Sequence, residues 1–179
     1  MKRRFDMPQN PIDIEKSSRH QKIIGNLGEN LVCNWLSRSG LEVTIVDHTG
    51  IDIIAYNPRT KERLGITVKS RTRNPGKEKD PVNLFSYRKG KNDRQKVIDA
   101  CQAFGCDEWI AVYVETTDYA DLYLTSLRNY DAKYRGNKER VIDNWKMRPK
   151  NLVAYEQDNE TMHLHMKFES RNWFKKESL

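Results

Sequence analysis

An aspartate and a lysine stand at either end of two apolar runs in the middle of the chain. Asp52 lies near the start of residues 51–56, and Lys69 lies near the end of residues 64–70. The second run alternates apolar and polar residues, so Thr67 and Lys69 are predicted to point to one face of a strand. An acid and a lysine on an otherwise apolar sheet are costly unless something is bound there. This stretch is therefore the first candidate for a functional site.

The residues between the two runs predict a turn. Asn57, Pro58 and Thr60 provide turn chemistry, so both runs are expected to be strands of one meander. If those strands pair, Asp52 faces Thr67 and Lys69 across the ladder, within reach of cross-strand neighbours.

A helix over residues 17–39 is predicted upstream of these strands. Its apolar residues follow helical spacing and make one broad face, and Glu29 lies at the margin of that face, where a carboxylate is usually solvated. Gly25 and Gly28 each lower helix propensity by roughly 1 kcal/mol relative to alanine. Their presence makes sense if this face packs closely on a sheet or a ligand.

The coarse order of elements is α-β-β-β-α-β, followed by a mixed C-terminal part. Further strands are expected at 41–46, 109–114 (buried on both faces), 121–125, 152–155 and 162–168, and helices at 93–104, 126–134 and 138–145. Residues 71–91 are expected to form a loop with a short ordered piece at 82–87.

Two histidines share a face of the last predicted strand. His163 and His165 are separated by one residue, a spacing that could suit a metal ion. No third ligand is close to them in the sequence. The pair is therefore interpreted as part of an exposed edge strand.

The net charge of +7 is unevenly distributed. Residues 59–96 contain thirteen Lys or Arg against four Asp or Glu, whereas residues 97–127 contain six acids and no Lys or Arg. A basic segment that follows a candidate site is typical of a protein that holds a polyanion, and nucleic acid is the expected partner. The alternative is a solvated loop. The residues expected to hold phosphates are Ser70, Arg71, Arg73, Lys77, Lys79, Arg88, Lys89 and Lys91.

Length and composition favour a single soluble domain in the cytoplasm. The chain has 179 residues, 37% of them hydrophobic, and has no apolar run long enough to span a membrane. Its basic N-terminus is not followed by an apolar stretch and is not interpreted as a signal peptide. Three cysteines form no even framework, which favours reduced thiols. The expected organisation is an N-terminal arm (1–16), a core (17–127) and a C-terminal extension packed on that core (128–179).

Three short motifs together resemble the PD-(D/E)XK nuclease superfamily. They are Gly28-Glu29 on a helix, Gly50-Ile51-Asp52 opening a strand, and Val68-Lys69-Ser70-Arg71 closing the next strand. Their spacing is most similar to the archaeal Holliday-junction resolvases and related restriction-endonuclease-like branches. The similarity covers roughly residues 20–115.

The resemblance implies an α/β fold with a restriction-endonuclease-like core, in which helices flank a mixed sheet of four to five strands. It also implies hydrolysis of phosphodiester bonds assisted by Mg²⁺ or Mn²⁺. Asp52 would be the principal metal ligand and Glu29 an accessory ligand. Lys69 would orient or help to deprotonate the attacking water and offset charge in the transition state.

One position departs from the family pattern. The family has Asp or Glu two residues before the lysine, and here Thr67 occupies that position. A carboxylate could come from elsewhere, with Glu78 or Asp80 as candidates. Alternatively, Glu29, Asp52, Thr67 and the Val68 carbonyl hold the metal weakly, or the site is degenerate and the domain binds nucleic acid without cutting it.

Two classes of function follow from the sequence. The first is a metal-dependent endonuclease acting on DNA, with branched or mobile-element DNA as the expected substrate. The second is a catalytically degenerate nucleic-acid-binding module or a subunit of a defence or repair complex. The sequence does not distinguish DNA from RNA. Resolvase-like relatives work as dimers, so the resemblance also implies a homodimer.

Overall fold

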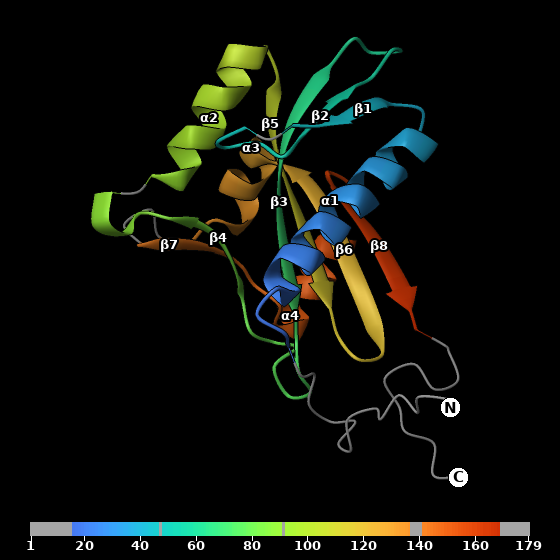
Figure 1. The fold of residues 1–179 in the computed structure, drawn as a ribbon, viewed down its shortest axis with the longest axis vertical. Coiled ribbons are helices and arrows are strands. Elements are labelled where there is room, and N and C mark those ends of the chain that lie inside the picture. Colours follow the sequence, from blue (N-terminus) through green and yellow to red (C-terminus); the bar gives the residue numbers. More distant parts are fainter. Residues whose placement is uncertain (1–15, 47, 91, 137–140, 169–179) are drawn as a thin grey trace, which may run out of the picture.

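The computed structural model describes residues 16–46, 48–90, 92–136 and 141–168. Figure 1 shows a sheet with helices on both of its faces. The helical elements are α1 (His20–Arg38), η1 (Arg88–Gly90), α2 (Asp93–Phe104), α3 (Leu127–Asn129), η2 (Tyr130–Tyr134) and α4 (Pro149–Glu156). The strands are β1 (Glu42–Ile45), β2 (Ile53–Tyr56), β3 (Arg63–Thr72), β4 (Val82–Ser86), β5 (Asp107–Glu115), β6 (Tyr119–Ser126), β7 (Ile142–Trp145) and β8 (Thr161–Lys167).

The main sheet has six strands in the order β1-β2-β3-β5-β6-β8. The β3–β5 pair is parallel and the other neighbours are antiparallel, so the predicted mixed sheet is confirmed. The number of strands exceeds the predicted four to five because β8, from the C-terminal part of the chain, pairs with β6. β8 is an edge strand, as the sequence predicted. β4 and β7 form a separate two-stranded ribbon.

Two hydrophobic clusters lie on opposite faces of the main sheet. On one face α1 packs on apolar side chains of β2, β3, β5 and β6. On the other face α2, the β4–β7 ribbon and α4 pack on the remaining side chains of β5 and β6. Successive residues of β5 alternate between the clusters, with Ala111 on the α1 side and Ile110 and Val112 on the α2 side. Both faces of β5 are therefore buried, as its continuous apolar pattern predicted.

Two predicted elements of the C-terminal part are wrong. Residues 142–145 form β7 rather than the end of a helix over 138–145, whose first residues lie outside the described part of the chain. The stacked rings of Trp145 and Tyr155, whose centroids are 4.1 Å apart, lie in the core between β7 and α4. Residues 152–155 belong to helix α4 rather than to a strand, and Pro149 at its first position is a recognised helix start.

No helix of the described residues combines the length and apolarity needed to cross a bilayer. The predicted N-terminal arm lies almost entirely outside the described residues, which begin at Lys16.

Helix α1 approaches β3 closely at Gly28. A Cβ atom at this position would lie 2.1 Å from Ser70 Oγ and 3.4 Å from the Tyr113 Cβ. A Cβ atom at Gly25, one turn earlier, would meet nothing within 4 Å. The close approach of helix and sheet that the glycines predicted is thus confirmed at Gly28.

The substitution Gly28→Ala is expected to destabilise the fold by about 1–3 kcal/mol, because the new methyl group overpacks the helix–sheet contact. Gly25→Ala is the matched control on the same helix, and it is expected to gain up to about 1 kcal/mol from helix propensity. Urea unfolding of both variants gives the two free energies. Equal stability of the variants would mean that Ser70 rotates away without cost.

Candidate active site

Asp52, Thr67 and Lys69 meet on one face of β3. The Asp52 N–H donates to the Ile66 carbonyl (2.9 Å), which extends the β2–β3 pairing by one residue. The Asp52 carboxylate accepts a hydrogen bond from the Val68 N–H (2.6 Å) and one from the Thr67 hydroxyl (3.3 Å). The Lys69 ammonium donates to the Thr67 hydroxyl oxygen (3.1 Å). The structure therefore brings together the acid, the hydroxyl and the lysine singled out from the sequence.

The turn that carries Asp52 is held against helix α2. Gly50 has a φ of +113°, and a Cβ atom there would lie 2.2 Å from the Lys96 carbonyl oxygen. Only glycine adopts this conformation without strain, and only a residue lacking a side chain fits so close to a helix backbone. The position of Asp52 is thus determined from both sides, by β3 and by α2.

Lys69 is largely withdrawn from water. Burial lowers the pKa of its ammonium below the ordinary value, while the carboxylates of Asp52 and Asp93 act in the opposite direction. Arg71 adds to the lowering, and Glu29 makes the smallest of these contributions, favouring the charged form. A desolvated lysine among carboxylates is the kind of group whose charge a bound phosphate would stabilise.

Asp93 is a carboxylate of this site that the sequence analysis missed. It is the first residue of α2 and accepts a hydrogen bond from the Ser86 N–H (3.3 Å) and one from the Lys96 ammonium (3.1 Å). Burial acts to raise the pKa of Asp93, but these hydrogen bonds outweigh it and hold the pKa below the ordinary value. Asp93 is therefore a stable anion close to Lys69.

A cleft of about 430 Å³ opens beside these groups, between α1, the end of β3, β4 and the start of α2. Among the described residues that line it, the charged ones are Lys69, Arg71 and Asp93. Gly25 of α1 lines its opposite wall, where the absence of a side chain leaves the cleft open. The cleft thus combines two cations with a carboxylate, a combination that suits a phosphate accompanied by a metal ion.

Glu29 lies on α1, next to Gly28, and is half-buried. Its negative charge favours the charged form of Lys69. Burial raises the pKa of the Cys33 thiol, and the charge of Glu29 raises it further. The close approach of α1 to β3 at Gly28 is what brings this carboxylate toward the lysine.

The predicted alternative carboxylates lie apart from the cleft. Glu78 accepts a hydrogen bond from the Gly76 N–H (2.8 Å), within the loop between β3 and β4. The charge of Asp80 acts on Arg73, which donates to the carbonyls of Asp80 and Pro81. Neither acid lines the cleft, whereas Asp93 does.

The predicted phosphate-binding residues fall into three groups. Arg71 is exposed and lines the cleft, and its guanidinium donates to the Ser70 carbonyl (2.7 Å). Ser70 is buried against α1, and Arg73 is tied to the β3–β4 loop. Lys77, Lys79 and Arg88 are exposed, whereas Lys91 and the side chain of Lys89 lie outside the described part of the chain.

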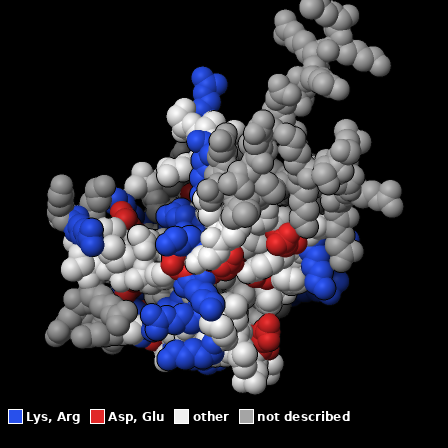
Figure 2. Space-filling view, turned by 90° about the horizontal axis from the view of Figure 1, so that it is seen from below, with Lys and Arg blue, Asp and Glu red and all other residues white. Residues whose placement is uncertain are grey.

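A second, basic groove adjoins the β3–β4 loop. This groove, which we call the basic groove, measures about 300 Å³, and none of the described residues that line it is acidic. It is lined by Lys79, Pro81, Asn144, Lys146, Met147, Arg148, Lys150 and Asn151. Figure 2 shows Lys and Arg side chains gathered in a band on the end of the molecule seen from below. The sequence analysis missed Lys146, Arg148 and Lys150 because they lie outside the most basic segment.

The fold, rather than the sequence, links this chain to known proteins. No protein-family model and no curated protein sequence matches the chain. A similar solved structure is that of Archaeoglobus fulgidus Hjc, a Holliday junction resolvase from an archaeal hyperthermophile. It has a TM-score of 0.50 and 16% sequence identity, and the match covers 73% of this chain and 88% of that chain. The restriction-endonuclease-like fold expected from the sequence is thereby confirmed.

Proposed function

We propose that this protein is a DNA endonuclease that hydrolyses phosphodiester bonds with the help of a divalent cation, Mg²⁺ or Mn²⁺. The observation that carries the proposal is the meeting of Asp52, Thr67 and Lys69 beside a cleft that also contains Arg71 and Asp93. The likeness of the fold to a Holliday junction resolvase supports it.

The oxygen donors next to the cleft fit a hard divalent cation, although Asp52, Thr67 and Glu29 do not themselves line the cleft. Asp52 would hold the ion, with the Thr67 hydroxyl and the Val68 carbonyl as neutral oxygen donors and Glu29 acting directly or through water. Oxygen donors with several retained waters are what Mg²⁺ prefers. We add Asp93 as the second carboxylate in place of the acid that Thr67 replaces, because it acts on the same lysine as Asp52 and lines the adjoining cleft. When bound, the cation polarises a phosphoryl oxygen and lowers the pKa of bound water.

Lys69 would act on the reacting phosphate. Its ammonium supplies fixed positive charge where negative charge develops in the transition state. Because burial already lowers its pKa, it can also hold or release a proton of the attacking water nearer to neutral pH than an exposed lysine can.

The DNA backbone would lie across the cleft and the basic groove. Exposed cations of the cleft and of the β3–β4 loop, including Arg71, Lys77 and Lys79, and the half-buried Lys146 of the basic groove are suited to phosphate contacts. Such contacts give affinity without reading sequence. Branched or mobile-element DNA remains the proposed substrate, and the homodimer implied by the family resemblance remains a prediction. The three cysteines are free, which fits the proposed cytoplasmic location.

The direct test is cleavage of labelled substrates by the purified chain. A four-way junction, a linear duplex of the same sequence and a matching RNA duplex are incubated with Mg²⁺, with Mn²⁺ or with EDTA. We expect metal-dependent cleavage of DNA, strongest on the junction. If the chain binds the junction tightly but cleaves it neither with Mg²⁺ nor with Mn²⁺, the proposed endonuclease activity is contradicted.

A second candidate function is supported by Thr67. This buried, neutral side chain replaces an anionic ligand, which is what a catalytically degenerate nucleic-acid-binding module would show. Such a module would bind DNA with steep salt dependence and without metal. Calorimetric titration with Mn²⁺ separates the two candidates, because only the enzyme should show saturable binding that is lost in Asp52→Asn.

Asp93→Asn is expected to lower metal affinity and cleavage by about 10–100-fold, the range found when a residue supporting a metal site is lost. Glu78→Gln and Asp80→Asn are the matched controls, since both acids lie in the same basic segment but outside the cleft. Cleavage rates at several Mn²⁺ concentrations measure the effect. If cleavage falls in Glu78→Gln or Asp80→Asn but not in Asp93→Asn, the loop carboxylates are again the candidates for the second metal ligand.

The triple variant Lys146→Gln, Arg148→Gln and Lys150→Gln is expected to weaken DNA binding at low salt. If each side chain contacts one phosphate, the slope of log K against log salt falls by up to about 3. A triple variant of Arg59, Lys61 and Arg128, all exposed and outside both grooves, changes the net charge equally and should keep the slope. Fluorescence anisotropy at several salt concentrations gives both slopes.

A further inference from the structure

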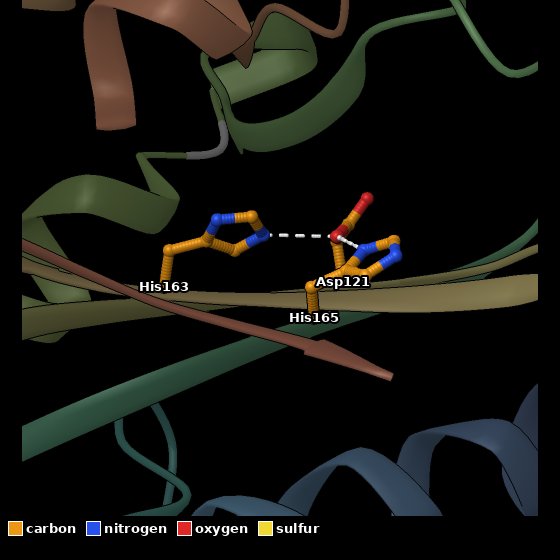
Figure 3. A group of neighbouring side chains, drawn as sticks. All are labelled: Asp121, His163 and His165. Atoms are coloured by element: carbon orange, nitrogen blue, oxygen red, sulfur yellow. Dashed lines mark hydrogen bonds and ion pairs between the residues drawn. The ribbon is translucent and has the colours of Figure 1, made fainter. Parts of the chain in front are cut away.

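Two histidines and a buried aspartate meet on the sheet face opposite α1, on strands β6 and β8. His165 is paired with Asp121 across the two strands, and His163 is paired with Tyr123, so the three side chains project from one face. One oxygen of Asp121, Oδ1, lies 2.9 Å from His163 Nε2 and 2.7 Å from His165 Nδ1. Figure 3 shows both rings turned toward this oxygen. A third side chain that could bind a metal ion thus lies beside the histidines in space, although none is close to them in the sequence.

The cluster is held by its surroundings. The ring of His163 stacks on that of Tyr123, with 4.4 Å between centroids and 8° between planes. The Asp121 side chain is only 7% exposed, whereas that of His165 is 43% exposed. The three groups are thus oriented by packing while one side of the cluster stays open to solvent.

We propose that Asp121, His163 and His165 bind a zinc ion. One ligand atom from each residue lies within 4.8 Å of the other two. Tetrahedral zinc with Zn–N and Zn–O distances near 2.0–2.1 Å places neighbouring ligand atoms about 3.3 Å apart. Each ring nitrogen therefore has to move a few tenths of an ångström away from Oδ1, and the two ring nitrogens, which lie within 4.8 Å of each other, have to reach the same spacing.

The chemistry of the ligands favours a transition metal such as zinc over the Mg²⁺ proposed for the Asp52 site. Imidazole nitrogens suit Zn²⁺, whereas Mg²⁺ requires oxygen donors. Three protein ligands and an exposed side leave a fourth position for water. The site lies on different strands from Asp52 and shares no residue with the cleft.

The ion would fasten β8 to the rest of the sheet. Within the described part of the chain, β8 is an edge strand and its one neighbour in the main sheet is β6. The unfolded chain does not hold these three ligands together, so an ion that binds them in the folded state raises the free energy of unfolding by RT ln(1 + [L]/Kd).

The test is a titration of the full chain with Zn²⁺, followed by calorimetry and by thermal unfolding, with Mg²⁺ in excess to saturate the divalent-cation site proposed at Asp52. We expect one saturable equivalent and a rise in unfolding temperature. We also expect visible absorption of a tetrahedral centre when Co²⁺ replaces Zn²⁺. Mg²⁺ should produce none of these effects at this site.

The variants identify the ligands. His163→Gln with His165→Gln should weaken zinc binding by more than the roughly 10–100-fold that follows loss of a supporting partner. His165→Gln alone, at the most exposed ligand, serves if the double variant does not fold. His48→Gln changes an exposed histidine elsewhere and should leave the titration unchanged, as should Asp52→Asn. Three outcomes would overturn the proposal: no saturable binding, binding unchanged in the histidine variants, or binding lost in Asp52→Asn.

Discussion

Replacing Asp52 with asparagine is expected to lower DNA cleavage by about 1000-fold or more, since several kcal/mol of transition-state stabilisation depend on the bound cation. The asparagine oxygen can still accept the hydrogen bond from the Val68 N–H, so the β2–β3 pairing should persist. The variant loses the negative charge that holds the cation and that favours the charged form of Lys69. Single-turnover cleavage of the junction measures the loss.

Asp99→Asn is the matched control for this experiment. Asp99 is exposed on α2, outside the cleft, and its replacement should leave cleavage unchanged. Binding of the junction in EDTA should also be similar in both variants. Cleavage by Asp52→Asn within tenfold of the wild type would exclude this carboxylate as the principal ligand.

Replacing Lys69 with methionine is expected to lower cleavage by about 100- to 1000-fold, the range found for removal of one group that stabilises developing charge. Stability should not fall with activity, because burial of the ammonium is unfavourable and methionine keeps most of the side-chain volume. Cleavage and thermal unfolding of the same preparation separate the two effects. Lys22→Met on the exposed side of α1 is the control.

The lowered pKa of Lys69 leads us to expect that the free energy of unfolding depends on pH. Its pKa is lower in the folded state than the ordinary 10.5, so between these two values the unfolded chain binds more protons than the folded chain. The free energy of unfolding contributed by this group therefore rises with pH across that interval. In Lys69→Met this contribution disappears. If the wild type and the variant show the same pH dependence in alkaline solution, Lys69 is not desolvated as described.

The sequence predicted the parts of the site that lie on strands with a clear period of two. Alternation in β3 placed Thr67 and Lys69 on one face, and the turn at Asn57 predicted the pairing that brings Asp52 beside them. Asp93 could not be found in this way, because an acid in the first turn of a helix is expected at that position for electrostatic reasons alone. Its place in the cleft depends on how α2 packs on the sheet.

Contacts between segments far apart in the chain also limited what could be predicted for the C-terminal part. His163 and His165 were recognisable as a pair, but Asp121 joins them only through the register of β6 and β8. β7 carries a buried tryptophan that packs on helix α4, and neither element has enough residues for a clear period. The order α-β-β-β-α-β, by contrast, includes the longer segments α1, β3, α2 and β5, whose patterns are regular.

The contact between Gly50 and the Lys96 backbone restricts which residues position 50 can accept as the sequence changes. The turn bearing one acid and the helix bearing the other touch at a point where no side chain fits. Any larger residue at position 50 would push the two carboxylates apart together with the segments that carry them. The distance between the carboxylates of Asp52 and Asp93 thus depends on glycine being present at position 50.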